Sequence, residues 1–146
     1  MILLDTNILV RLANRDDVDY RTTLDAIAGC LRKGHKLYVS DQTLQEFWVV
    51  CTRPKKNNGI GGTPERANQF LSQFTRIFEH LDDPPKLFNI WHNLVTSHAI
   101  VGLRSYDARL AAFALGARID RLMTYNNQHF SKFPLSLVDP HNPSTW

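Results

Sequence analysis

The 146-residue chain lacks the features that mark several large protein classes. It has only two cysteines and no C-x-x-C pair, and its six histidines form no H-x-x-x-H pattern, which argues against a disulfide framework and against a zinc site. No apolar run approaches the roughly 20 residues that cross a bilayer. Residues 1–10 contain no basic residue and include Asp5 within their apolar stretch, unlike a signal peptide. We therefore expect a cytoplasmic protein that does not engage a membrane.

The composition is that of an ordinary globular domain. Hydrophobic residues make up 43% of the chain and charged residues 21%, which is enough apolar material for a core and too little charge for a disordered segment. Internal repeats, charge blocks and long linkers are absent, so we expect a single domain over residues 1–146 with an irregular tail at 139–146. A net charge of +3 permits a nucleic-acid partner without requiring one.

Short apolar strands alternate with amphipathic helices along the chain. This alternation predicts an α/β fold in which helices cover both faces of a mostly parallel sheet. In such folds the functional groups lie at the carboxyl ends of the strands. The predicted strands are 2–4, 37–39, 78–81, 122–124 and 135–138, and the predicted helices begin near Ile8, span 20–33, end at Thr52, begin at Pro64, and span 86–98 and 105–116.

Two polar residues follow predicted strands. Asp5 comes directly after the first strand and before a helix, where an ordinary helix N-cap is also a common role for Asp. Asn126 follows the strand at 122–124 in a tandem Asn sequence, and tandem Asn is common in turns. Their positions after strands of a parallel sheet favour a functional role for both.

Two acidic residues lie within predicted helices. Glu46 belongs to the segment LQEFWVVC, which is apolar on nearly every side, and a buried carboxylate needs either an Arg or Lys partner or a bound cation. Asp107 lies in the first turn of a helix that we expect Ser105 to cap. It shares a face with Leu110 and Ala111 that we expect to be buried, although the helix dipole alone also favours Asp there.

These acids together indicate a metal site. Carboxylates that converge at one edge of a sheet repel one another unless a cation binds between them. Mg²⁺ and Mn²⁺ prefer oxygen ligands, and such an ion activates water and stabilises charge on a phosphoryl group. Asp5, Glu46 and Asp107 are therefore candidates for a divalent-metal site that hydrolyses phosphodiesters.

The order of these segments resembles the PIN-domain ribonucleases, and most closely the VapC-type toxins of toxin–antitoxin pairs. The resemblance covers roughly residues 1–139. It implies a three-layer α/β/α sandwich around a five-stranded sheet, cleavage of RNA that depends on Mg²⁺ or Mn²⁺, a homodimer, and a small antitoxin protein that covers the active site. The segments that carry it are Asp5-Thr6-Asn7 after an apolar strand, the helix with Glu46, the sequence GLRSYDARLAA (102–112) with Asp107, and the Thr124-x-Asn126 turn.

The resemblance also implies a role for each residue. Asp5, Glu46 and Asp107 match the catalytic positions that hold the metal. Thr6 matches a supporting hydroxyl position, and we group Thr124 with it. Asn126 matches a fourth catalytic position that is usually Asp, and its missing charge leaves open whether one ion or two ions bind.

Basic residues in a glycine-rich loop are the candidates for substrate binding. Arg53, Lys55 and Lys56 lie in the loop 53–63 that follows the helix with Glu46. A flexible basic loop at this point would contact RNA phosphates, although an ordinary solvated loop has the same composition. His129 stands where many relatives carry an acid, and it is either a substrate contact or a surface turn residue.

Two other functions stay open from the sequence. A phosphatase of the haloacid dehalogenase type also begins with a strand that ends in Asp, but it requires Asp-x-Asp where this chain has Asp5-Thr6-Asn7. A PIN-like fold with a weakened site would instead be an RNA-binding or protein-interaction module. Asn126 is the feature that favours this last interpretation.

Overall fold

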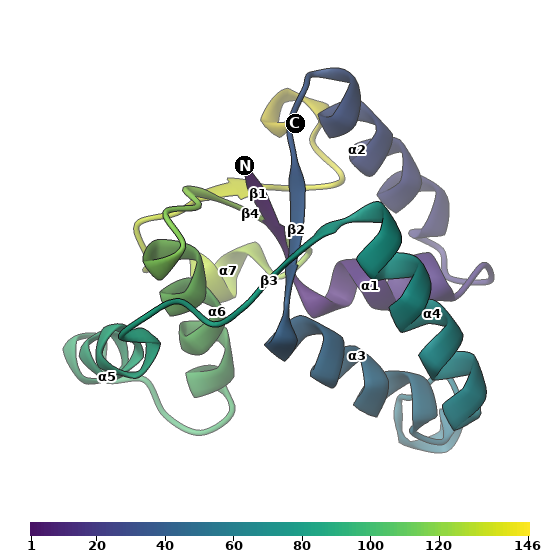
Figure 1. The fold of residues 1–146 in the computed structure, drawn as a ribbon, viewed down its shortest axis with the longest axis horizontal. Helices are drawn as coiled ribbons and strands as arrows, with labels where there is room; N and C mark the ends of the chain where they lie inside the picture. The colour runs from purple at the N-terminus through teal and green to yellow at the C-terminus, as the bar shows by residue number, and fades with distance from the viewer.

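The computed structural model describes all 146 residues and contains one five-stranded sheet between two groups of helices (Figure 1). Every strand pair is parallel, and the strand order is β3-β2-β1-β4-β5. The predicted α/β fold is therefore confirmed. The strands are β1 (Ile2–Leu4), β2 (Leu37–Ser40), β3 (Glu79–Leu81), β4 (Arg121–Met123) and β5 (Ser136–Val138).

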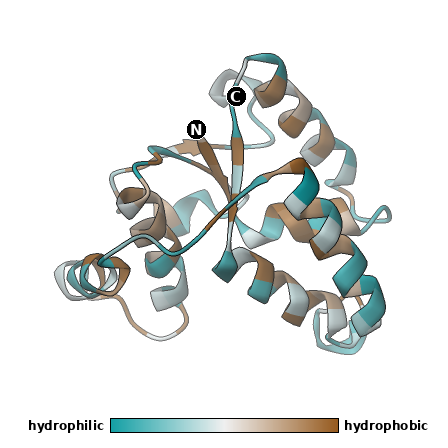
Figure 2. Cartoon of the chain, viewed as in Figure 1, coloured by the Kyte–Doolittle hydropathy of each residue, from teal (hydrophilic) through white to brown (hydrophobic).

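Helices cover both faces of the sheet. Alternate residues of each strand point to opposite faces, so each face has its own hydrophobic core. Ile2 and Leu4 belong to a core that α1 to α4 complete, whereas Leu3 belongs to a second core with α5 to α7. Strand β1 is hydrophobic along its length (Figure 2), as a strand buried on both faces must be. The helices are α1 (Thr6–Ala13), α2 (Tyr20–Arg32), α3 (Asp41–Thr52), α4 (Pro64–Ile77), α5 (Leu87–Ser97), α6 (Arg104–Gly116) and α7 (Asn127–Phe130), with short 3₁₀ helices η1 (Lys55–Asn57) and η2 (Pro143–Thr145).

The helices α3 and α6 begin differently. Ser40 caps α3, with a reciprocal hydrogen-bond pair to Thr43. Helix α6 begins at Arg104 after Leu103, and no side chain caps it, so the prediction that Ser105 caps this helix is wrong. Ser105 already has helical geometry there, one residue inside the helix.

The side of the sheet to which the chain adds its strands changes between β3 and β4. The chain builds β2 and β3 on one side of β1 and then β4 and β5 on the other. In a parallel sheet, the carboxyl ends of the strands on either side of such a switch form a natural crevice. Asp5 follows β1 and Thr124 follows β4, so both lie at this point.

The two cysteines are buried free thiols, as expected. None of the helices has the length and hydrophobicity that spanning a membrane requires.

Candidate active site

Asp5 is the most buried acid of the chain, with 8% of its surface exposed. It stands at the N-cap position of α1, but its side chain makes no capping hydrogen bond. Its Oδ2 instead accepts hydrogen bonds from Thr124 Oγ1 at 2.6 Å and from Asn7 Nδ2 at 2.7 Å. Helix capping therefore does not explain this buried carboxylate.

The environment of Asp5 disfavours its charged form. Burial raises the pKa of Asp5 from 3.8 to about 6, the hydrogen bond from Thr124 acts against this increase, and the carboxylates of Glu46 and Asp107 add to it. Glu46 and Asp107 therefore lie near enough to Asp5 for their charges to act on its carboxylate.

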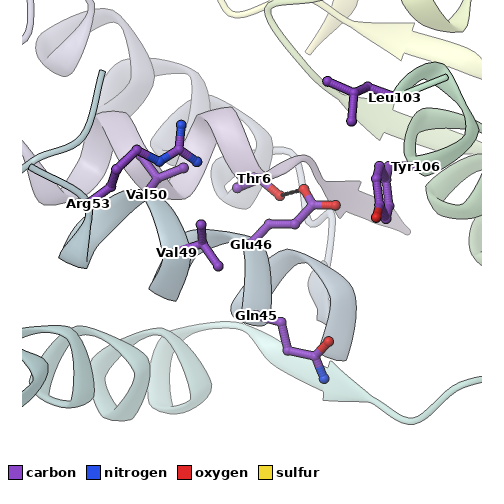
Figure 3. A pocket seen from close by; sticks show the side chains of 8 residues that line it. All are labelled: Thr6, Gln45, Glu46, Val49, Val50, Arg53, Leu103 and Tyr106. Atoms are coloured by element: carbon purple, nitrogen blue, oxygen red, sulfur yellow. Dashed lines mark hydrogen bonds between the residues drawn. The ribbon is translucent and has the colours of Figure 1, made fainter. Parts of the chain in front are cut away.

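Glu46 lies on α3 and is only partly buried. The prediction that α3 is buried almost all round is wrong, because Gln45 and Val49 on its outer side are exposed. Glu46 Oε2 accepts a hydrogen bond from Thr6 Oγ1 at 2.7 Å, which joins α3 to α1 (Figure 3). Its Oε1 accepts from Gln42 Nε2 at 2.8 Å. Neutral donors hold this carboxylate, and it forms no salt bridge.

Asp107 lies in the first turn of α6, as predicted, and 25% of its side chain is exposed. It is the only one of the three acids with an Arg or His side chain in contact with its carboxylate. Arg104 Nη1 lies 3.3 Å from its Oδ2, and His129 Nδ1 lies 3.2 Å from the same atom. His129 therefore contacts a carboxylate of the site and is more than a surface turn residue.

Thr124 and Asn126 are placed differently. Thr124 is fully buried, and its hydroxyl oxygen accepts a hydrogen bond from the backbone N–H of Asn126 at 2.9 Å. Asn126 itself is exposed, and its side chain makes no hydrogen bond with Asp5, Glu46 or Asp107. Asn126 thus joins the site through its backbone.

Asn7 is a site residue that our sequence reasoning missed. Its Nδ2 donates to Asp5 Oδ2 and lies 3.2 Å from Thr124 Oγ1, and its Oδ1 accepts from the backbone N–H of Tyr125 at 3.3 Å. The side chain therefore ties the end of β1 to the end of β4. Its position two residues after Asp5 was the available signal.

The basic residues of the 53–63 loop are not equivalent. Arg53 lines a pocket of about 480 Å³ together with Thr6 and Glu46 (Figure 3). Lys55 and Lys56 form the exposed start of η1 and do not line this pocket. The rest of the pocket wall is mostly apolar and consists of Gln45, Val49, Val50, Leu103 and Tyr106.

The donor chemistry fits a hard divalent cation. No three His, Cys, Asp or Glu side chains form a closed metal-binding cluster. However, Mg²⁺ keeps several waters and needs only one or two protein carboxylates. Asp5 and Glu46 supply oxygen atoms only and have no cationic partner. We therefore regard the acids of this site as suited to Mg²⁺ or Mn²⁺ with water in the remaining positions.

Comparison with known proteins agrees with the fold. The sequence model of the PIN domain family matches residues 2–134. VapBC2 from Rickettsia felis was solved bound to a DNA fragment from its promoter. This structure has 26% sequence identity to the chain and a TM-score of 0.69, and the match covers 95% of this chain and 98% of that chain. No curated protein matches the sequence significantly.

Two further solved structures share the fold at lower identity. The VapC20 toxin of Mycobacterium tuberculosis, described as cleaving the sarcin–ricin loop, has 16% identity and a TM-score of 0.70, over 90% of this chain and 95% of that chain. FitAcB from Neisseria gonorrhoeae has 15% identity and a TM-score of 0.70, over 97% of this chain and 99% of that chain.

Proposed function

The chain belongs to the PIN domain family, and we propose that it is a ribonuclease that depends on Mg²⁺ or Mn²⁺ and acts as the toxin of a toxin–antitoxin pair. The observation that supports the proposal is the buried carboxylate of Asp5 beside Thr6, whose hydroxyl group holds Glu46, with the Glu46 and Asp107 carboxylates near enough to raise the pKa of Asp5. Two of these acids have no cationic partner. The family match also argues against the phosphatase alternative.

Each site residue has a part in this proposal. Asp5, Glu46 and Asp107 hold the ion. The hydroxyl groups of Thr6 and Thr124 fix the carboxylates that they contact. A bound ion would supply the positive charge that activates water and stabilises the phosphoryl oxygens.

Asn126 occupies the fourth catalytic position in this proposal. It carries no charge, and its exposed amide is free to orient water or substrate beside the acids. The number of ions that bind, one or two, depends on whether this neutral side chain suffices for a second site.

The substrate would approach along the pocket that ends at Glu46. Arg53 lines this pocket, and its side chain makes no hydrogen bond or salt bridge within the chain, so its charge is available to a phosphate. Lys55 and Lys56 lie beyond it on η1 and would contact more distant phosphates. Because VapC20 is described as cleaving the sarcin–ricin loop, a structured RNA loop is the first substrate to test.

We infer a small antitoxin protein as the partner. The neighbour from Rickettsia felis was solved as VapBC2 on promoter DNA. A basic side chain from such a partner would replace the cation among the carboxylates and would keep the nuclease inactive. We also propose that the active form is a homodimer of chains that each form a single PIN domain.

The test is cleavage of labelled structured RNAs, including a sarcin–ricin loop, by the purified protein with Mg²⁺, Mn²⁺ or EDTA. We expect cleavage with either metal, none with EDTA, and none by Asp107→Asn. Asp25→Asn is the matched control, since Asp25 is exposed on α2 and forms no salt bridge.

The opposite outcome has a defined meaning. If the wild-type protein neither cleaves these RNAs nor binds Mn²⁺, the acids are structural and the chain is an RNA-binding or protein-interaction module. The lack of a closed acidic cluster and the exposed Asn126 are the observations that favour this second function.

A further inference from the structure

Gln42 occupies a central position that the proposed nuclease chemistry does not explain. It lies one turn before Glu46 on α3, and only 7% of its surface is exposed. Its Nε2 donates to Glu46 Oε1 at 2.8 Å and to the backbone oxygen of Tyr106 at 2.9 Å. Its Oε1 accepts from Arg109 Nη1 at 3.0 Å. Every polar group of the amide therefore has a partner.

These partners allow only one orientation of the Gln42 amide. A guanidinium group donates hydrogen bonds and cannot accept them, so the amide oxygen must face Arg109. The two N–H groups must then face the two oxygen acceptors, which are the Glu46 carboxylate and the Tyr106 carbonyl. The hydrogen-bond network thus fixes which way the amide faces.

Arg109 is held away from Glu46 by a second acid. Its Nη2 lies 2.6 Å from Asp83 Oδ2, in the turn that precedes α5. The guanidinium group of Arg109 is consequently paired with Asp83, and the neutral amide of Gln42 stands between Arg109 and Glu46. Asp107, in contrast, has direct contacts with Arg104 and His129.

The same amide connects two acid-bearing helices. Tyr106 directly precedes Asp107 on α6, so the hydrogen bond to its backbone oxygen ties α3 to the start of α6. Tyr106 and Glu46 face each other across the pocket in Figure 3. Displacement of Gln42 would therefore change the relative position of Glu46 and Asp107.

We propose that Gln42 is a positioning residue that orients Glu46 through a neutral hydrogen bond and separates this carboxylate from the Arg109–Asp83 ion pair. Glu46 in this way has no salt bridge with Arg109, and its carboxylate oxygens are left to a cation. Without Gln42, Arg109 would pair with Glu46 directly and compete with the metal. The inference rests on the proposed function, because it takes Glu46 to be a ligand of Mg²⁺ or Mn²⁺.

The test measures Mn²⁺ affinity by calorimetry and thermal stability in EDTA for the full chain. Gln42→Met keeps the length of the side chain and removes its hydrogen bonds. We expect a 10- to 100-fold loss of Mn²⁺ affinity, the size typical when a residue that supports a metal ligand is removed. Gln73→Met is the matched control, because Gln73 is exposed on α4, makes no hydrogen bond and does not line the pocket that contains Glu46. It should bind Mn²⁺ as the wild type does.

Two further variants separate positioning from general damage to the fold. In Gln42→Met/Arg109→Met the competing cation is gone, so we expect part of the lost Mn²⁺ affinity to return. Damage to the fold would instead add to the loss. Asp83→Asn changes a residue with 41% of its side chain exposed, which should fold normally, yet it frees Arg109 and should weaken Mn²⁺ binding several-fold.

These measurements distinguish failure of the Gln42 proposal from failure of the nuclease proposal. If the wild-type protein does not bind Mn²⁺, the proposed function fails. If the wild type binds Mn²⁺ and Glu46→Gln weakens binding, but Gln42→Met and Asp83→Asn bind as tightly as the wild type, the role of Gln42 is overturned. A Gln42→Met loss that the double variant does not relieve overturns the separation from Arg109.

Discussion

At the scale of single residues, the charge of Asp5 is the main energetic cost of the site. The folded state raises the pKa of Asp5 from 3.8 to about 6, so it binds a proton more tightly than the unfolded chain. By linkage, stability is lost as the pH rises from about 4 to about 6. A metal-binding site accepts such a cost because the cation that binds there removes it.

Asp5→Asn tests this cost directly. In EDTA, we expect the stability gain of the variant over the wild type to be about 2 kcal/mol larger at pH 7 than at pH 4, because a neutral amide carries no ionisation penalty. Urea denaturation at the two pH values measures the difference. An equal difference at pH 4 and pH 7 would show that Asp5 is ionised without penalty.

Thr124 limits the pKa increase at Asp5, because its hydroxyl group donates to the charged carboxylate. Thr124→Val removes the donor and keeps the shape, so the pKa of Asp5 should rise above about 6. It should also reduce stability at pH 7 by about 1–3 kcal/mol. Carbon-13 NMR titration of the Asp5 carboxyl group reports the pKa, and Thr124→Ser should retain the wild-type value. An unchanged pKa in Thr124→Val would contradict this account.

The sequence indicated the three acids and the supporting hydroxyl groups of Thr6 and Thr124, but not the amide side chains of Asn7 and Gln42 that also contact the acids. Asp5 was recognisable because it follows an apolar strand directly. Asn7 lies only two residues after Asp5, but Gln42 carries no local signal of this kind, because Tyr106 and Arg109 become its neighbours only in the folded chain. The hydrogen bond between Gln42 and Arg109, for example, joins positions 67 residues apart, and no periodicity in the sequence records such a pairing.

At the scale of elements, α3 and the loop after it define the approach to the site. The sequence of α3 is apolar enough to suggest full burial, yet only one side packs against α1 and α4. Its outer side is exposed beside the pocket that Arg53 lines. Apolar residues at a binding surface and in a core look alike in the sequence, and this similarity explains the error.

Gly59 holds the loop close to the end of α3. A Cβ atom at Gly59 would lie 1.9 Å from the backbone oxygen of Arg53, so Gly59→Ala must displace the loop backbone. We expect a larger loss of thermal stability than for Gly34→Ala, where nothing lies within 4 Å and only the positive φ of +80° is unfavourable, at a cost of about 1 kcal/mol. Equal losses would show that the loop moves freely.

Arg53 should make the largest contribution of the loop to RNA binding. In a catalytically inactive Asp107→Asn protein, Arg53→Gln should weaken RNA binding. The slope of log Kd against log salt concentration should fall by about 0.7 for each phosphate that the variant no longer neutralises. Lys55→Gln and Lys56→Gln should have smaller effects, because these residues lie outside the pocket. Arg32→Gln, at the exposed end of α2, removes the same charge as a control, and an equal effect would mean that only net charge matters.

At the scale of the whole molecule, the parallel sheet explains why distant residues meet. The alternation of strands and helices was sufficient to predict the sheet and the edge at which the acids lie. The strand order was not predictable, since it depends on which side of β1 each later strand joins. That choice places β4 beside β1 and brings Thr124 to Asp5.

Metal binding should therefore stabilise the whole chain and report the number of ions. An ion that binds only the folded state adds RT ln(1 + [L]/Kd) to the unfolding free energy. Above Kd, stability at pH 7 should rise by about 1.4 kcal/mol for each tenfold increase in Mn²⁺ if one ion binds, and by about twice that amount for two ions. Because Asn126 contributes no charge to the acidic cluster, we expect the slope for one ion. Urea denaturation across a Mn²⁺ series measures it, and Asn126→Asp tests the cause. The added carboxylate should increase the slope toward the value for two ions, whereas a two-ion slope in the wild type would contradict the role assigned to Asn126.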